Sequence, residues 1–276
     1  MSLSILSANA RDGLTWASRG FALFLRKPLA FSALFAVFMF AALILLILPY
    51  IGAVLLLMAL PLLGLGFMVA ARAAIGGDNV HSGQLLEPLR GGSEIARARR
   101  KQLLLLCGLY ALMTALVMVA SEALDGGAFE RLQVLLVSPR DAAKQREIEA
   151  LLADGNLRLG LLLRLGGTAL LSIPFWHAPA LVWWQGQGVA QSLFSSTVAC
   201  WRNRAAFAVY GLAWVVAIVA FSVVAGGVFV LIGAPQLVTL AAVPAGLMFS
   251  TAFYVSLLFT YQGCFSDRDE AAASAS

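Results

Sequence analysis

The sequence has 276 residues, of which 61% are hydrophobic and only 12% are charged. A soluble domain carries about 25% charged residues, so most of this protein's surface must meet lipid rather than water. The net charge of +5 comes from basic residues that flank apolar stretches. Because these residues do not cluster on a soluble surface, the charge pattern argues against nucleic-acid binding.

Residues 13–27 predict an amphipathic helix that lies flat on the membrane surface before the first long apolar stretch. Thr15, Arg19 and Arg26 fall on a mostly polar face. We expect the opposite, apolar face to hold Leu14, Ala17, Phe21, Phe24 and Leu25.

Six apolar stretches are each long enough to cross about 30 Å of hydrocarbon as a helix. None shows the alternation of a barrel strand, so the sequence predicts an all-α, six-span membrane protein. We expect one membrane domain over residues 1–265 and an unstructured tail over 266–276. The predicted spans are 28–50, 52–72, 102–121, 165–184, 207–231 and 237–261.

The segment 122–164 predicts a small hairpin of two helices on the outer side of the membrane. Asp125–Gly127 provides the turn that precedes the first, short helix. Ser138 as N-cap would begin the second helix, 139–153, and Gly155-Asn156 would end it. This hairpin would either cover its own membrane domain or bind a partner.

A second amphipathic stretch, residues 188–204, precedes the fifth span and aligns with 13–27, and a weaker third copy begins at Val80. Three similar units, each a surface segment and two spans, would form parallel repeats about an axis along the membrane normal. The alternative is that such features are common in membrane helices anyway. Spans two, four and six each contain a proline: Pro61, Pro174 and Pro244. The apolar face of 188–204 would hold Val189, Leu193, Phe194, Val198 and Trp201.

Charge predicts the orientation of the chain in the membrane. Twelve basic residues and four acidic ones lie before the first span, between the second and third, and before the fifth. The segment 122–164, on the other side, carries six basic and seven acidic residues. The positive-inside rule therefore predicts that both termini lie in the cytoplasm.

His177 is the ionisable residue that we place inside a span, between Pro174 and Pro179. The two prolines remove helix donors and expose carbonyl groups. An ionisable group at membrane depth is a candidate for a proton-relay or ligand site. The structural alternative is a neutral imidazole bonded to a freed carbonyl. We also expect Arg164 to pair with Glu122, mainly in a structural role.

No residue pattern indicates catalysis or a cofactor. The three cysteines, Cys107, Cys200 and Cys264, form no CxxC pair or cluster with histidine, so neither a metal site nor a disulfide framework is predicted. The sequence also lacks nucleotide-binding, metalloprotease and serine-hydrolase motifs. We therefore expect a protein that is not an enzyme and has no cofactor.

Three stretches carry a resemblance. They are Gly20-Phe21-Ala22-Leu23-Phe24 before Arg26-Lys27-Pro28, Gly66-Phe67-Met68-Val69-Ala70-Ala71-Arg72, and Ala199-Cys200-Trp201-Arg202-Asn203-Arg204-Ala205-Ala206-Phe207. With these, nearly the whole chain resembles a family of uncharacterised six-span proteobacterial inner-membrane proteins of unknown function. The resemblance implies the topology and a location in the bacterial inner membrane, and it implies no catalytic residue.

The sequence favours a non-enzymatic scaffold or accessory component that interacts with lipid or with another membrane protein. The alternative is a small transporter or lipid-handling permease that uses the proline-broken helices around His177, Pro174, Pro179, Pro61 and Pro244. Anionic lipid headgroups are expected to bind the basic surface. The residues expected to contact them are Arg19, Arg26, Lys27, Arg202 and Arg204.

Overall fold

The computed structural model describes residues 3–138, 141–234 and 236–267, and it confirms an all-α polytopic fold. Six helical segments are long and apolar enough to cross a membrane. They are α2 (Pro28–Leu46), α3 (Ile51–Ile75), α4 (Glu94–Asp125), α7 with α8 (Gly155–Phe175 and Ala178–Gln185), α10 (Arg204–Leu231) and α11 (Leu237–Cys264).

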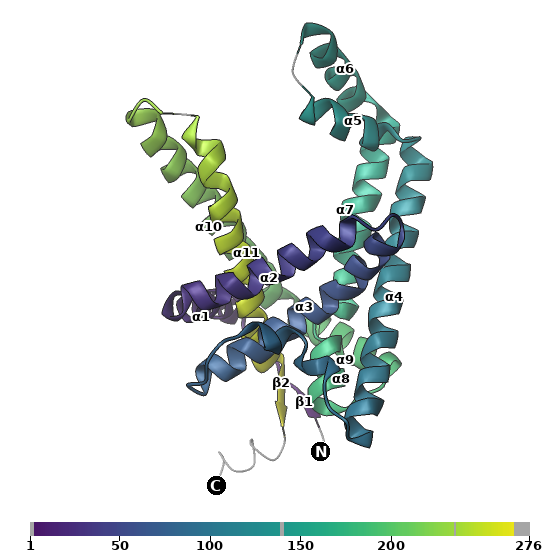
Figure 1. Ribbon diagram of the computed structural model, residues 1–276, viewed down its shortest axis with the longest axis vertical. Helices are drawn as coiled ribbons and strands as arrows, with labels where there is room; N and C mark the ends of the chain where they lie inside the picture. Colours follow the sequence, from purple (N-terminus) through teal and green to yellow (C-terminus); the bar gives the residue numbers. More distant parts are fainter. Residues whose placement is uncertain (1–2, 139–140, 235, 268–276) are drawn as a thin grey trace.

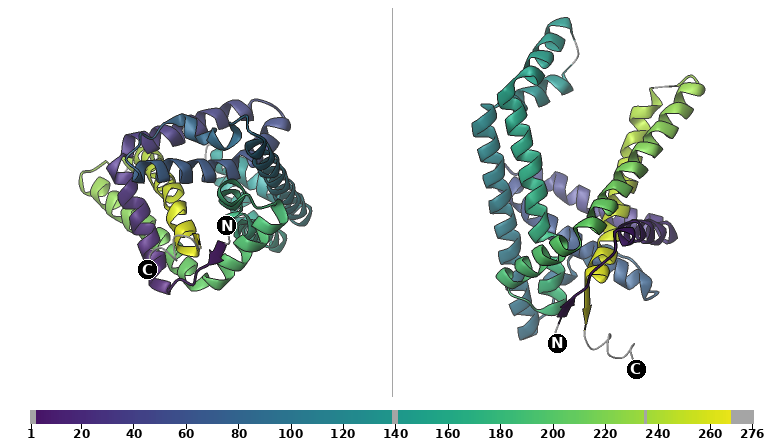
Figure 2. Two further views of the ribbon diagram at one scale, coloured as in Figure 1. Left: turned by 90° about the horizontal axis from the view of Figure 1, so that it is seen from below. Right: turned by 180° about the vertical axis from the view of Figure 1, so that it is seen from behind.

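Four of the six segments form two arms that diverge from one end of the molecule, and α2 and α3 run across the molecule between these arms (Figures 1 and 2). One arm consists of α4 and α7, and the other consists of α10 and α11, so the two arms form a V (Figures 1 and 2). Two short helices, α5 (Ala128–Val137) and α6 (Ala142–Ala153), lie at the far end of the first arm (Figure 1). Both described chain ends lie at the opposite end of the molecule. We call that end the base; it also holds the helices α8 and α9 (Val189–Arg202).

Helix α1 (Ala10–Arg26) is packed into the base through glycine. A side chain at Gly13 would overlap the carbonyl of Ala206 on α10, and one at Gly20 would overlap Ser256 on α11. Of the expected apolar face, Ala17 and Phe24 are buried, whereas Leu14 and Leu25 are 58% and 55% exposed. The buried residues of α1 are Gly13, Trp16, Ala17, Gly20, Leu23 and Phe24.

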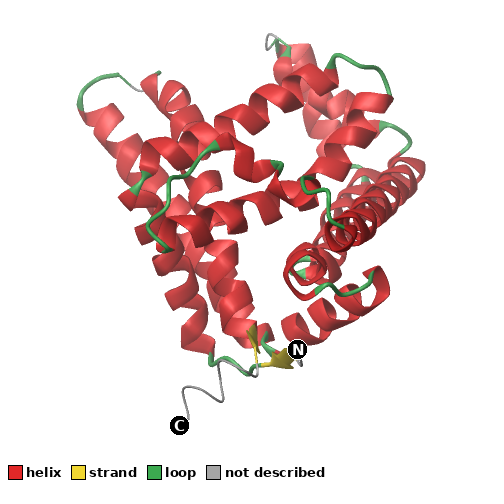
Figure 3. Ribbon diagram, turned by 60° about the horizontal axis from the view of Figure 1, so that its bottom comes forward, coloured by secondary structure: helices red, strands yellow, loops and turns green. Residues whose placement is uncertain are grey.

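A short antiparallel ribbon joins the two ends of the described chain (Figure 3). Strand β1 (Leu3–Ile5) pairs with β2 (Phe265–Asp267), with Ser4 opposite Ser266. Two residues of the expected tail, Ser266 and Asp267, thus belong to a strand, and the rest of that tail lies outside the described residues. Because this ribbon continues from α11, the N-terminal segment is held against the last span.

The segment between α4 and α7 differs from expectation at two helix ends. Asp141, not Ser138, caps α6 and accepts a hydrogen bond from the backbone of Lys144; Pro139 lies outside the described residues. Gly155-Asn156 begins α7 rather than ending a helix, because Asp154 accepts a hydrogen bond from the Asn156 amide and acts as N-cap. The fourth span therefore starts ten residues earlier than expected. The left-handed turn at Gly126 and Gly127 is confirmed.

Helix α9 packs against the protein through small and polar residues and leaves its large apolar residues outward. Its buried residues are Ser192, Ser196, Ala199 and Cys200, whereas Phe194 and Trp201 are exposed. The stretch after Val80 forms two 3-10 turns, η1 (Ser82–Leu85) and η2 (Glu87–Leu89), rather than an amphipathic α-helix. The threefold repeat therefore stays a prediction.

Candidate functional site

The fourth span is broken where Pro174 and Pro179 flank His177. Helix α7 ends at Phe175 and α8 begins at Ala178, so His177 lies in the gap as the N-cap residue of α8. At a helix end the last carbonyl groups lose their helical donors and must find others in an apolar medium. The Ile173 carbonyl accepts a hydrogen bond of 3.1 Å from Ser196 Oγ on α9. The break is thus closed by a side chain from a neighbouring helix.

His177 is fully buried within this break. Its backbone amide donates to Ser196 Oγ at 3.1 Å, and its Nε2 lies 3.2 Å from Thr260 Oγ1 on α11. Thr260 Oγ1 already donates to the Leu257 carbonyl at 2.8 Å. Because a hydroxyl has one proton, Nε2 must be the donor in the His177–Thr260 contact. The imidazole partner is thus a hydroxyl and not a freed carbonyl, which corrects that expectation.

The remaining ring nitrogen of His177, Nδ1, is an acceptor that makes no hydrogen bond within the described residues. Aromatic rings surround the imidazole, with the centroids of Phe207, Tyr261 and Phe265 at 5.9, 6.0 and 5.3 Å. These rings shield the buried histidine from solvent. The arrangement joins α7, α8, α9 and α11 into one unit.

The five residues predicted around a membrane-depth site are not brought together. Pro61 and Pro179 line the same cavity, of about 180 Å³, whose walls include Trp176 and Tyr254. His177 and Pro174 do not line this cavity, and Pro244 is exposed on the outer half of α11. The cavity therefore joins two of the predicted prolines without reaching the ionisable group.

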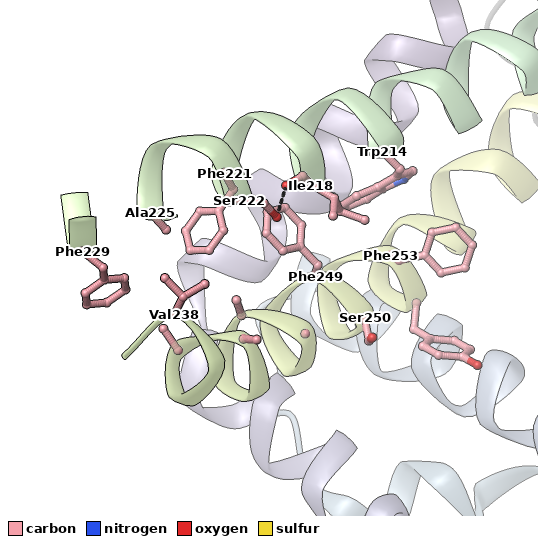
Figure 4. Close-up of a pocket in the computed structure, with 15 residues that line it drawn as sticks. Trp214, Ile218, Phe221, Ser222, Ala225, Phe229, Val238, Phe249, Ser250 and Phe253 are labelled. Atoms are coloured by element: carbon pink, nitrogen blue, oxygen red, sulfur yellow. Dashed lines mark hydrogen bonds between the residues drawn. The ribbon is translucent and has the colours of Figure 1, made fainter. Parts of the chain in front are cut away.

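Two larger apolar grooves flank α10. The first, which we call the arm groove, has a volume of about 430 Å³ and lies between α10 and α11 (Figure 4). Phe221 and Phe249 face each other across it with ring centroids 5.4 Å apart, and Phe229 lies near its far end (Figure 4). Its α11 side is lined largely by small residues: Ala241, Ala242, Ala245 and Gly246.

The second groove, which we call the basal groove, has a volume of about 410 Å³ and lies between α7, α9 and the first half of α10. Trp214 and Phe253 line both grooves, so the two are neighbours along α10. The mouth of the basal groove contains Arg204 and Trp201. Its other lining residues are Ser172, Ile173, Trp176, Cys200, Phe207, Tyr210 and Gly211.

The five basic residues predicted to meet headgroups have different surroundings. Lys27 Nζ donates to the Asp78 carbonyl at 2.6 Å, and Arg202 Nε donates to Ser7 Oγ at 2.6 Å. The guanidinium of Arg19 lies 4.5 Å from the centroid of Phe259, and that of Arg204 lies 5.8 Å from the centroid of Trp201. Arg26 is exposed at the end of α1. Within the described ranges, none of the five forms an ion pair.

Three polar side chains that the sequence did not single out hold the base and the first arm together. Asn203 is buried, accepts from the Ala8 amide at 2.7 Å and donates to the Leu6 carbonyl at 3.1 Å. At the far end of the α4–α7 arm, Ser121 Oγ donates to the Gly160 carbonyl at 2.8 Å. Asp125 lies beside Arg164 of the same arm. Charge alone does not distinguish Asp125 from Glu122, which lies three positions earlier in the sequence.

Arg164 pairs with Asp125, not with Glu122 as expected. Its Nη2 lies 3.8 Å from Asp125 Oδ2, and its Nε donates to Ser121 Oγ at 3.1 Å. Glu122 is exposed, because its position on α4 faces away from α7. The pair therefore has the geometry of a structural contact, because it links α4 to α7.

Cys200 borders both the broken span and the basal groove. Its Sγ lies 3.7 Å from the Ile173 carbonyl, and burial raises the pKa of its thiol to about 12. The thiolate is the reactive form of cysteine, so this side chain is protonated and inert at neutral pH.

Comparison with known proteins identifies one clear relative. No protein-family model and no solved structure matches the chain. A probable inner membrane protein of Burkholderia thailandensis is 32% identical over 270 residues, covering 98% of this chain and 97% of that protein. The apolar helices and this similarity agree that the protein resides in the inner membrane. The chain belongs to the same family as this probable inner membrane protein.

Proposed function

We propose that this protein is a non-enzymatic scaffold or accessory component of the inner membrane, which holds an apolar transmembrane segment of another membrane protein in the arm groove. The observation that carries the proposal is the groove itself, an apolar space of about 430 Å³ between two helices of the same arm. Phe221 and Phe229 lie on its α10 side, while alanine and glycine form much of its α11 side. Small residues allow the backbone of another helix to approach closely.

The loose packing of the α10–α11 arm supports this role. In lipid, no hydrophobic force drives two apolar helices together, so association depends on close packing and hydrogen bonds. Only 6% of the most apolar 18-residue stretch of α10 is buried, compared with 44% of the corresponding stretch of α3. The outer half of α10 thus offers surface that the rest of the chain does not cover.

The basic residues at the base suit anionic lipid headgroups as a further partner. Arg19, Arg26 and Arg204 are exposed and are not neutralised by a carboxylate within the described ranges. Each basic residue near an anionic surface contributes about 1 kcal/mol of attraction. Such contacts would hold the base against the leaflet while the arm receives its partner.

The transporter alternative depends on His177 facing a hydrated path. In the structure this residue is surrounded by Phe207, Tyr261 and Phe265, and it lines neither the arm groove nor the basal groove. We therefore favour the scaffold. His177→Ala separates the two proposals: loss of a solute flux at normal membrane levels would favour transport, whereas retained partner binding favours the scaffold.

A photo-reactive phenylalanine analogue at position 221 tests the proposal in native membranes. Phe221 points into the arm groove, whereas Val219 on the same helix is 55% exposed and does not line it. We expect a cross-link from position 221, mapped by mass spectrometry to an apolar helix of one protein, and none from position 219. Ala245→Leu fills the groove and should abolish the cross-link from position 221. Cross-links to lipid alone at both positions would contradict the proposal.

A further inference from the structure

The basal groove has one charged end and one apolar end. Arg204 lies at its mouth, where its Nη1 donates to the Trp201 carbonyl at 3.4 Å. Trp201 is 69% exposed beside it, as is typical of tryptophan at the interface between lipid and water. Deeper residues of the groove are aromatic: Trp176, Phe207, Tyr210, Trp214 and Phe253.

The groove matches the depth of one leaflet. Arg204 and Trp214 lie on the same helix, and the rise of about 1.5 Å per residue places them roughly 15 Å apart along its axis. This is about half of the 30 Å hydrocarbon thickness. A transmembrane helix would need space through both leaflets, whereas one lipid molecule needs only this depth.

The charge of the groove selects among lipids. Arg204 is free of carboxylate partners within the described residues, and its guanidinium offers the planar set of donors that recognises a phosphate. The walls below it supply apolar and aromatic surface with few polar atoms, which suits an acyl chain. A neutral ligand would leave the one charged group of the groove without a counter-charge.

We propose that the basal groove binds one anionic glycerophospholipid, with its phosphate at Arg204 and an acyl chain lying along α10 as far as Trp214. This inference rests on the proposed lipid contacts of the base and gives them a defined site. It does not depend on what occupies the arm groove. The lipid belongs to the leaflet on the side of the base, which the charge pattern predicts to be cytoplasmic.

Quenching of tryptophan fluorescence by lipids with brominated acyl chains tests the site in the purified full-length protein. Phosphatidylglycerol is titrated against phosphatidylcholine with the same chains. We expect about fivefold tighter binding of phosphatidylglycerol, the gain from one basic group. Arg204→Gln should remove this preference. Arg202→Gln is the matched control, because Arg202 is held by Ser7 and does not line the groove.

A second pair of variants tests the acyl-chain path. Gly211 lines the groove, and an added side chain there meets open space, so Gly211→Leu should block the chain without disturbing the fold. Gly227 is equally unobstructed on the same helix but lies outside the groove, so Gly227→Leu should quench like the parent protein.

Three outcomes would overturn the lipid site. They are a preference that survives Arg204→Gln, an equal loss in Arg202→Gln, and unchanged quenching in Gly211→Leu. The cross-link from position 221 is scored in the same variants. A retained cross-link with no lipid preference overturns this site alone, whereas a lost cross-link with intact preference counts against the scaffold proposal.

Discussion

The two halves of the α10–α11 pair differ in what holds them. In the base, α1 packs against both helices, and Tyr210 Oη lies 2.6 Å from Ser256 Oγ as a direct bond between them. In the arm, Phe221 and Phe249 meet across an open groove. The same two helices are therefore fixed by backbone-close packing and hydrogen bonds at one end only. In lipid, apolar character alone does not close the other end.

Gly20→Leu should produce the largest break in this comparison. A side chain at position 20 overlaps Ser256, so α1 must move away from α11. We expect a loss of about 3 kcal/mol or more in unfolding free energy, measured by thermal unfolding in detergent. Gly227→Leu in the arm meets open space and should cost nothing measurable. Equal effects of the two changes would show that base and arm are packed alike.

Asn203→Ala should release the N-terminal segment from the base. The change leaves the Ala8 amide and the Leu6 carbonyl without their partner, at a cost of about 2 kcal/mol. Hydrogen exchange of residues 3–9 should rise, while exchange in α10 beyond Trp214 stays as it was. Thr197→Ala, on the exposed face of α9, is the control. Unchanged protection of residues 3–9 would remove Asn203 from its anchoring role.

The Asp125–Arg164 pair tests how the other arm, formed by α4 and α7, is held together. A double-mutant cycle of Asp125→Ala with Arg164→Ala should give a coupling energy of about 1–2 kcal/mol, because both groups are largely buried. The same cycle with Glu122→Ala should give about zero, since Glu122 is exposed. Coupling to Glu122 instead would restore the pairing expected from the sequence.

Phe221→Ala should have the smallest effect on stability. Phe221 is 40% exposed and lies in the arm groove, so we expect less than about 1 kcal/mol in the free energy of unfolding. Phe67 is fully buried in α3, so Phe67→Ala should lower the free energy of unfolding by about 3 kcal/mol. Similar melting shifts for the two variants would mean that the arm groove is packed as tightly as the interior around Phe67.

Hydropathy was sufficient to predict the six spans, because a run of apolar residues that matches the bilayer has few alternatives. It could not predict which face of α1 or α9 turns inward. Both the lipid and the protein interior are apolar, so large hydrophobic residues occur on both faces, and the small residues Gly13, Gly20 and Ser196 mark the packed ones. Gly155-Asn156 was misread because the same residue types serve at helix starts and ends.

Site residues were predicted only where their chemistry was local. His177 stands out beside two prolines, but its partner Thr260 is 83 residues away and is supplied by the fold alone. Arg204 was recognised as basic, whereas the groove beneath it is formed by α7, α9, α10 and α11 together. The pairing of Arg164 depended on helix rotation, which apolar periodicity on a lipid-facing helix does not define.

The glycine contacts of α1 also constrain the order of events during synthesis. Gly13 packs against Ala206 and Gly20 packs against Ser256, so α1 cannot reach its final position until almost the entire polypeptide has been made. At about 5–20 residues per second, the ribosome needs roughly 10–40 s to make that intervening stretch. Helix α1 is therefore made well before its packing partners, and it reaches its final position only after they exist.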